Sequence, residues 1–399
     1  MIKNNLNFFN NIQKKNLDSK SIKKFTKLFP KIFSKVFTDI NSSKKTLNIL
    51  NRKFNFNFEF KDLEKFKSFK TIAIIGMGGS ILGSEAVSHF LKEKINKKIY
   101  FFNDLNIEKI QNFKKKKNLN KILFFVISKS GNTVETLSNF FTLKIIKKNS
   151  KNIIIISEKK NNLLYSLSKK FNLFYIEHKN YIGGRYSVLS EVGVVPAYLM
   201  GININKLRSG SLKSLKKTQL FLKDSTIMLS SLLSFKKIDN LIFLNYCPEL
   251  EKFLFWCQQL IAESLGKNGK GFLPTISNAP KDHHSLLQLY LDGPKNKLFY
   301  IFSHEESSKE KINIKEILKE KNFLNNKTLS SIKKAQKNAL IKTLKNKNIP
   351  FREFKIKNIN EEVLGELFSY FILETVIIGK LTNINPFDQP AVEQVKIYT

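Results

Sequence analysis

Two series of short apolar runs alternate with helix-sized amphipathic intervals along the chain. The first series comprises residues 71–76, 98–102, 122–127, 153–156 and 173–176, and the second comprises residues 241–246, 298–302 and 351–356. Continuous apolar runs of this length predict strands buried on both faces of a parallel sheet. Helical patterns fill the intervals, including residues 249–265, 286–291, 330–345 and 361–379. The sequence therefore predicts an α/β fold with two doubly wound parallel-sheet domains.

These two series suggest a division of the 399 residues into four parts. We expect residues 1–60 to form a helical N-terminal extension packed on a first domain at residues 61–205. A second domain is expected at residues 215–380, joined to the first near residues 202–220, and residues 381–399 form a C-terminal tail. A chain of this length can bury a separate core in each domain.

Composition indicates a soluble, folded protein, because 42% of the residues are hydrophobic and 36 residues are Phe. The longest apolar stretch, residues 367–378, contains Glu374 and is too short to cross a bilayer. Cys247 and Cys257 form no CxxC pattern, and the first residues contain no sustained apolar segment. We therefore expect a cytoplasmic protein without disulfides or a metal site.

The formal net charge of +37 raises nucleic acid or an anionic membrane as possible partners. However, the lysines are scattered along the chain, and the run Lys114 to Lys117 lacks interleaved aromatic residues. We expect a solvated basic surface, with no nucleic-acid partner and no membrane partner. Such a surface would still steer a small dianion towards a pocket.

A hydroxyl-rich segment, Ser128-Lys129-Ser130-Gly131-Asn132-Thr133, lies between the strand at 122–127 and a helical stretch that begins at Val134. A helix N-terminus with free backbone N–H groups favours a phosphate at this position. We expect the hydroxyls of Ser128, Ser130 and Thr133 and the charge of Lys129 to bind that phosphate. The alternative is that these residues only cap the helix.

The first strand ends in the glycine-rich turn Gly76-Met-Gly-Gly79-Ser80, which allows close backbone approach to a ligand. Its glycine spacing differs from G-x-G-x-x-G, Asp104 lies too far on, and no G-K-[ST] follows. We therefore expect no nucleotide cofactor here, and we expect Gly79 and Ser80 to contact the substrate.

Six segments resemble, in chain order, the motifs of the glucose-6-phosphate isomerase family: residues 75–83, 128–136, 183–187, 263–269, 282–289 and 385–396. The resemblance covers roughly residues 70–396. It implies two sugar-isomerase (SIS) domains in a homodimer with shared active sites. It also implies interconversion of glucose 6-phosphate and fructose 6-phosphate, in glycolysis and gluconeogenesis, through ring opening and a cis-enediol, without metal or nucleotide.

An aldose–ketose isomerisation needs a carboxylate that carries a proton between C2 and C1 and a cation that stabilises the enediolate. Glu263 is the expected carboxylate, because it ends an apolar helical run just before Gly266 and Gly269. Arg185 is the expected stabilising cation, and the adjacent Gly184 is expected to let the substrate approach the backbone. The alternatives are a solvated helix-end glutamate and a surface loop arginine.

Ring opening needs a group that gives and takes a proton near neutral pH, and the run Asp282-His-His-Ser285 contains two histidines. The family pattern of a histidine followed by a small residue aligns with His284, and the resemblance implies that this histidine reaches the partner subunit's site. The resemblance also implies that Lys396 assists ring opening and that Gln389 lies near the substrate. A solvated tail is the alternative for Lys396.

Two other functions remain open at this point. Ala391 stands where glycine is common in the family, and the phosphate loop also resembles those of sugar-phosphate-binding transcription regulators and aminosugar isomerases. A dual phosphoglucose/phosphomannose isomerase would also turn over mannose 6-phosphate. A non-catalytic sugar-phosphate sensor would bind its ligand without turnover.

Overall fold

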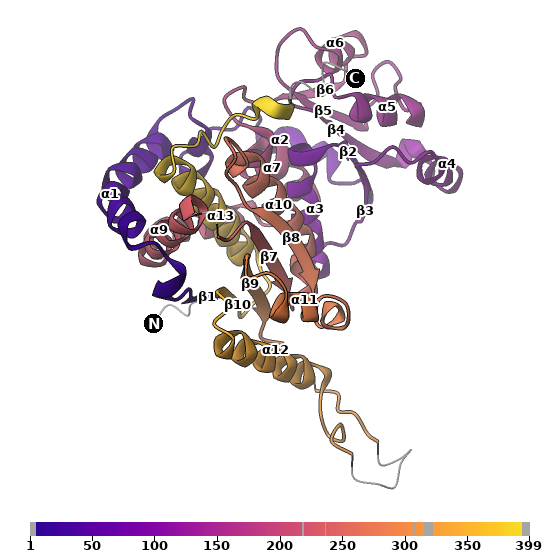
Figure 1. Cartoon of the computed structure of the whole chain (residues 1–399). Coiled ribbons are helices and arrows are strands. Elements are labelled where there is room, and N and C mark those ends of the chain that lie inside the picture. Colours follow the sequence, from indigo (N-terminus) through magenta and orange to yellow (C-terminus); the bar gives the residue numbers. More distant parts are fainter. Residues whose placement is uncertain (1–4, 218, 236, 307–308, 315–321, 393–399) are drawn as a thin grey trace.

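The computed structural model describes residues 5–217, 219–235, 237–306, 309–314 and 322–392. This part of the chain contains two five-stranded sheets (Figure 1). The first sheet is wholly parallel, in the order β3-β2-β4-β5-β6. Its strands are β2 (Thr71–Gly76), β3 (Lys98–Phe102), β4 (Ile122–Ile127), β5 (Ile153–Ser157) and β6 (Phe174–Glu177). The predicted parallel α/β fold is confirmed.

The helices of this half alternate with its strands, as the amphipathic intervals predict. They are α3 (Leu82–Phe90), α4 (Ile107–Lys116), α5 (Val134–Leu143), α6 (Leu163–Lys170) and α7 (Glu191–Leu199), preceded by the short α2 (Phe60–Leu63). Strand β2 pairs with β3 on one side and with β4 on the other. The order of strands therefore reverses at β2, and the loops that follow β2 and β4 leave the sheet at this reversal, where open α/β sheets commonly bind ligands.

The second sheet has the order β1-β10-β9-β7-β8. Its strands are β1 (Leu6–Asn11), β7 (Asn240–Asn245), β8 (Leu273–Asn278), β9 (Lys297–His304) and β10 (Phe351–Ile356), and only β1 is antiparallel to its neighbour. The helices of this half are α10 (Glu251–Leu265), α11 (Leu287–Asp292), α12 (Leu329–Asn346) and α13 (Glu361–Leu381). Nearly every residue of α13 is buried, and this helix belongs to one apolar core that residues of both sheets share, so the expected separation into one core for each domain is not seen there.

The N-terminal segment departs from its predicted place. Strand β1 pairs with β10 of the second sheet, and helix α1 (Ser19–Asn41) packs against α9 (Gln219–Phe235) and α13 (Figure 1). A wholly helical extension on the first domain is therefore wrong for residues 6–41. Further along the N-terminal segment, Thr46 does contact the first predicted domain: its Oγ1 donates to the Tyr181 carbonyl at 2.6 Å.

Two further elements differ from the sequence prediction. Helix α8 (Ile204–Lys217) fills the predicted connection and packs along α13. Strand β8 was not predicted, because Pro274 follows its exposed first residue and the strand lies at a sheet edge. In the described ranges, no helix is both long and apolar enough to cross a membrane.

Candidate active site

The hydroxyl-rich turn follows β4 directly and leads into α5. Ser128 Oγ lies 2.8 Å from Thr133 Oγ1 and 3.4 Å from Ser130 Oγ, so the three predicted hydroxyls are together. Lys129 is held by the protein: its Nζ donates to the Asn180 carbonyl at 2.8 Å and lies 3.6 Å from the Glu158 carboxylate. Burial lowers the pKa of Lys129, and the neighbouring Glu158 partly opposes that shift.

The glycine turn after β2 forms a 3₁₀ helix, η4 (Gly78–Ser80), which packs against a second one, η7 (Gly184–Leu189). A Cβ atom on Gly79 would lie 2.1 Å from the Gly184 carbonyl carbon, so only glycine permits this approach. Ser187 Oγ donates to the Gly79 carbonyl at 3.3 Å. The contact brings three of the predicted site residues, Gly79, the buried Ser80 and Gly184, to one place.

Arg185 forms the centre of the site and is only 2% exposed. Each of its five N–H groups has a hydrogen-bond acceptor: Ser264 Oγ (2.8 Å), Glu263 Oε2 (3.1 Å), Gln389 Oε1 (2.7 Å), and the carbonyls of Pro386 (2.6 Å) and Asp388 (2.9 Å). Three predicted residues, Arg185, Glu263 and Gln389, therefore meet in one cluster. A guanidinium is suited to this position because its charge persists when it is buried and its donors have a fixed geometry.

Glu263 lies at the end of α10, with its side chain 28% exposed. One carboxylate oxygen accepts from Arg185, and the other accepts from Gln259 Nε2 at 2.9 Å. The carboxylate is thus fixed in orientation but still reachable from solvent, which is what a proton-transfer group needs.

Two further side chains orient Arg185. Tyr186 is buried, and its hydroxyl lies 2.8 Å from Ser264 Oγ and donates to the Pro386 carbonyl at 2.8 Å. Burial raises the pKa of Tyr186, which keeps its hydroxyl protonated as a donor. Tyr186 and Ser264 therefore link η7 to α10 and to the tail.

His284 lies apart from this cluster in the structure. It ends the 3₁₀ helix η9 (Lys281–His284) and is exposed, and in the described part of the chain it has no hydrogen bond to Arg185 or Glu263. The neighbouring His283 Nε2 is 2.7 Å from the Tyr246 hydroxyl, and burial lowers the pKa of His283. Lys396, the other predicted ring-opening residue, lies outside the described residues.

Comparison with known proteins identifies the family to which a chain with these motifs belongs. A model of the phosphoglucose isomerase family matches residues 34–398. The chain belongs to the phosphoglucose isomerase family. Glucose-6-phosphate isomerase of Methanocaldococcus jannaschii is 33% identical over 349 residues, which cover 84% of this chain and 86% of that relative. Probable glucose-6-phosphate isomerase of Methanococcus maripaludis is 34% identical over 384 residues, which cover 89% of this chain and 86% of that relative.

The fold agrees with this membership. The crystal structure of a glucose-6-phosphate isomerase from Chlamydia trachomatis superposes on this member of the phosphoglucose isomerase family with a TM-score of 0.77 at 16% identity. The superposition covers 99% of this chain and 87% of that chain. The two-sheet architecture is thus retained at low sequence identity.

Sequence reasoning missed three residues of the candidate site: Gln259, Ser264 and Tyr186. Gln259 lies one helical turn before Glu263, and this i, i+4 spacing was the signal that could have revealed it. The other two lie directly beside Glu263 and Arg185 in the family motifs.

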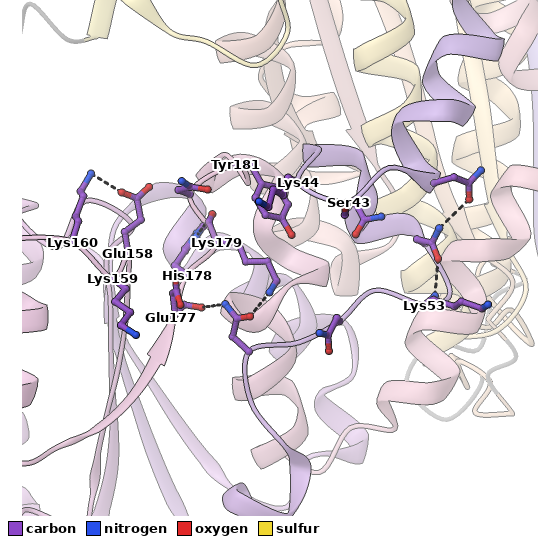
Figure 2. A pocket seen from close by; sticks show the side chains of 16 residues that line it. Ser43, Lys44, Lys53, Glu158, Lys159, Lys160, Glu177, His178, Lys179 and Tyr181 are labelled. Atoms are coloured by element: carbon purple, nitrogen blue, oxygen red, sulfur yellow. Dashed lines mark hydrogen bonds and ion pairs between the residues drawn. The ribbon is translucent and has the colours of Figure 1, made fainter.

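A separate polar cavity of about 750 Å³ is lined by Lys44, Glu177, Tyr181 and neighbouring residues (Figure 2). Its lining includes Glu158 and Asn180, the two residues that hold the Lys129 ammonium, together with the buried His178. None of the predicted site residues lines this cavity. We therefore assign the site to the Arg185 cluster and the neighbouring loops rather than to the cavity.

Proposed function

We propose that this chain is a glucose-6-phosphate isomerase that interconverts glucose 6-phosphate and fructose 6-phosphate in glycolysis and gluconeogenesis. The observation that carries the proposal is the Glu263 carboxylate held between Arg185 and Gln259 at the meeting point of the family motifs. The isomerisation moves hydrogen between neighbouring carbons and leaves the composition of the sugar unchanged. Its central step needs one carboxylate that transfers the proton and one fixed cation that stabilises the intermediate.

In the proposed mechanism, Glu263 removes the C2 proton of the open-chain aldose. The electron pair forms the C1–C2 double bond of a cis-enediolate, and the C1 carbonyl oxygen takes the negative charge. The protonated Glu263 then delivers its proton to C1 while the proton of the C2 hydroxyl passes to the C1 oxygen, so that C2 becomes the ketose carbonyl. Arg185 stabilises the negative oxygen of the intermediate through its positive charge, because its N–H groups already have acceptors within the protein. Because its five hydrogen bonds already fix the guanidinium, little reorganisation accompanies the reaction.

The substrate phosphate binds at the turn that follows β4. Hydrogen bonds to the phosphate come from the hydroxyls of Ser128, Ser130 and Thr133 and from backbone N–H groups at the N-terminus of α5. Lys129 adds a positive charge next to these groups. On the sugar side of the site lie Gly79, Ser80, Gly184 and Gln389. The contact of η4 with η7 supports this arrangement, because it places the first three residues next to Arg185.

Ring opening is assigned to His284 and Lys396, and the enzyme is proposed to be a cytoplasmic homodimer. His284 is exposed and is not a hydrogen-bond partner of Glu263 among the described residues, which supports a role in the partner subunit's site. A homodimer then contains two sites, each completed by a histidine of the other subunit.

The first test is conversion of fructose 6-phosphate to glucose 6-phosphate in excess EDTA, followed with a coupled dehydrogenase that detects glucose 6-phosphate. We expect turnover that EDTA does not change. Binding of the sugar phosphate without turnover would contradict the proposal and favour the sensor. Additional turnover of mannose 6-phosphate would identify the dual isomerase.

The base is tested by Glu263→Gln, which keeps the size and shape of the side chain and removes its basicity. We expect kcat to fall by about 10²–10⁴-fold with sugar-phosphate binding nearly intact. Glu93→Gln, at an exposed position, is the control and should retain wild-type kcat. Loss of binding with a retained rate would remove Glu263 from the base role.

A further inference from the structure

Lys267, in the loop that follows α10, contacts residues 385–388 of the chain after α13. Lys267 Nζ lies 2.7 Å from Asp388 Oδ1 and donates to the Asn385 carbonyl at 2.5 Å. The Lys267 side chain is only 11% exposed, whereas that of Asp388 is 50% exposed. Asp388 Oδ2 also accepts from Asn385 Nδ2 at 2.7 Å, so the lysine contacts a segment that is already folded on itself.

This contact is separate from the one that Arg185 makes with the same segment. Arg185 and Tyr186 bind backbone carbonyls, those of Pro386 and Asp388, while Lys267 binds the Asp388 carboxylate. Residues 385–389 are therefore held from two sides. Among the described contacts of residues 385–389 with Arg185, Tyr186 and Lys267, the Lys267 contact is the one that uses a charged side chain of this segment.

We propose that Lys267 is a positioning residue that fixes residues 385–389 through Asp388 and thereby keeps Gln389 against Arg185. Gln389 directly follows Asp388, so a displacement of Asp388 moves the Gln389 amide from its 2.7 Å contact with the guanidinium. The effect on catalysis rests on the proposed isomerase function, because that function places Gln389 at the substrate.

The surroundings of the tail support this assignment. Asn385 and Asp388 are exposed, while Pro386 is buried and Phe387 packs on the core beside Tyr186. Apolar contacts therefore hold the middle of the segment, and the Lys267 ion pair acts at Asp388. An ion pair in which one partner is largely buried is screened less than a fully exposed pair. The Lys267 hydrogen bond also holds the pKa of Asp388 below its ordinary value, so the carboxylate stays charged at neutral pH.

The same loop offers a matched control. Lys270 lies three residues after Lys267, but its Nζ donates to the Thr382 carbonyl at 3.2 Å, at the end of α13. Loss of Lys270 removes a lysine of the same loop and leaves the contacts of residues 385–389 in place.

The test compares Lys267→Met, Asp388→Asn, Lys267→Arg and Lys270→Met in the full chain. Hydrogen exchange of residues 385–392 reports whether the tail is held, and steady-state kinetics report kcat and KM for fructose 6-phosphate. We expect faster exchange in the first two variants, with kcat/KM lower by up to about 10²-fold, because a small displacement of a positioned group is costly. Lys267→Arg, which keeps the charge, and Lys270→Met should resemble the wild type in both measurements.

If hydrogen exchange of residues 385–392 were as slow in Lys267→Met as in the wild type, Lys267 would not hold this segment and the proposal would be wrong. Faster exchange with unchanged kinetics would show that Lys267 does not position Gln389 for catalysis. Exchange of residues 385–392 as fast in Lys267→Arg as in Lys267→Met would show that the ion pair does not hold the segment. A wild-type protein without isomerase activity would instead contradict the proposed function. The exchange measurement would still decide whether Lys267 holds the tail.

Discussion

Arg185 shows how one side chain can join distant parts of a chain. It binds Glu263, which is 78 residues further along, and Gln389, which is 204 residues further along. A buried guanidinium left without acceptors would be strongly unfavourable, so each acceptor stabilises both the fold and the site. The sequence indicated the arginine, but its partners depend on how three separate segments meet.

The contact between the two glycine turns leads to a prediction of stability. A Cβ atom on Gly79 would overlap the Gly184 backbone at 2.1 Å, whereas a Cβ atom on Gly184 would lie 3.9 Å from Gly79 Cα. We expect Gly79→Ala to lower the free energy of unfolding by about 1–3 kcal/mol and Gly184→Ala to change it far less. Urea unfolding of both variants measures the difference. Equal loss in the two would contradict this steric account.

His178 predicts a pH dependence of stability. Burial lowers its pKa from 6.5 to about 4, so between these pH values the unfolded chain binds more protons than the folded chain. The stabilising effect of the neutral imidazole is complete above pH 6.5 and decreases by about 3 kcal/mol as the pH falls through this window. A His178→Gln variant should lose this part of the pH dependence. Parallel stability profiles of the two proteins would refute the prediction.

At the scale of elements, the sequence predicts those strands that consist of a continuous apolar run. Eight strands have apolar runs and were predicted, including β3 and β6 at the edges of the first sheet. The edge strands of the second sheet, β1 and β8, contain more polar residues and were not predicted. An edge strand has a neighbour on only one side and can remain partly polar, so its pattern resembles that of a loop.

The core of the second half contains a buried ion pair between β10 and α13. Arg352 Nη1 lies 2.7 Å from Glu374 Oε1, with side-chain exposures of 0% and 3%, and the hydroxyls of Tyr300 and Tyr370 bond to both. Arg352→Met leaves the carboxylate buried without its cation and should cost about 3–5 kcal/mol in the free energy of unfolding.

The matched control for that variant is the exposed pair of Lys61 and Glu59, 2.7 Å apart. We expect Glu59→Gln to leave the urea midpoint unchanged, because solvent screens an exposed pair. A loss of stability in Arg352→Met no larger than in this control would show that the buried pair does not stabilise the fold.

At the scale of the whole molecule, the net charge of +37 affects how a substrate arrives. A positive field attracts a sugar-phosphate dianion, and salt shortens the range of that attraction. We expect kcat/KM for fructose 6-phosphate to fall as ionic strength rises from about 0.02 to 0.2 M, with kcat nearly constant. A value of kcat/KM independent of salt would show that the field does not assist binding.

The sequence alone determined the parallel strands within each sheet, the two hydroxyl- and glycine-rich turns, and the family to which the chain belongs. These features are local, because apolar runs and short motifs are read within a few residues. Only the tertiary structure decided that β1 joins the second sheet and that Gln259, Tyr186 and Ser264 surround the predicted pair of Glu263 and Arg185. It also decided that Lys267 meets Asp388. Such contacts join residues far apart in sequence or on different faces of an element, so packing determines them and local pattern does not.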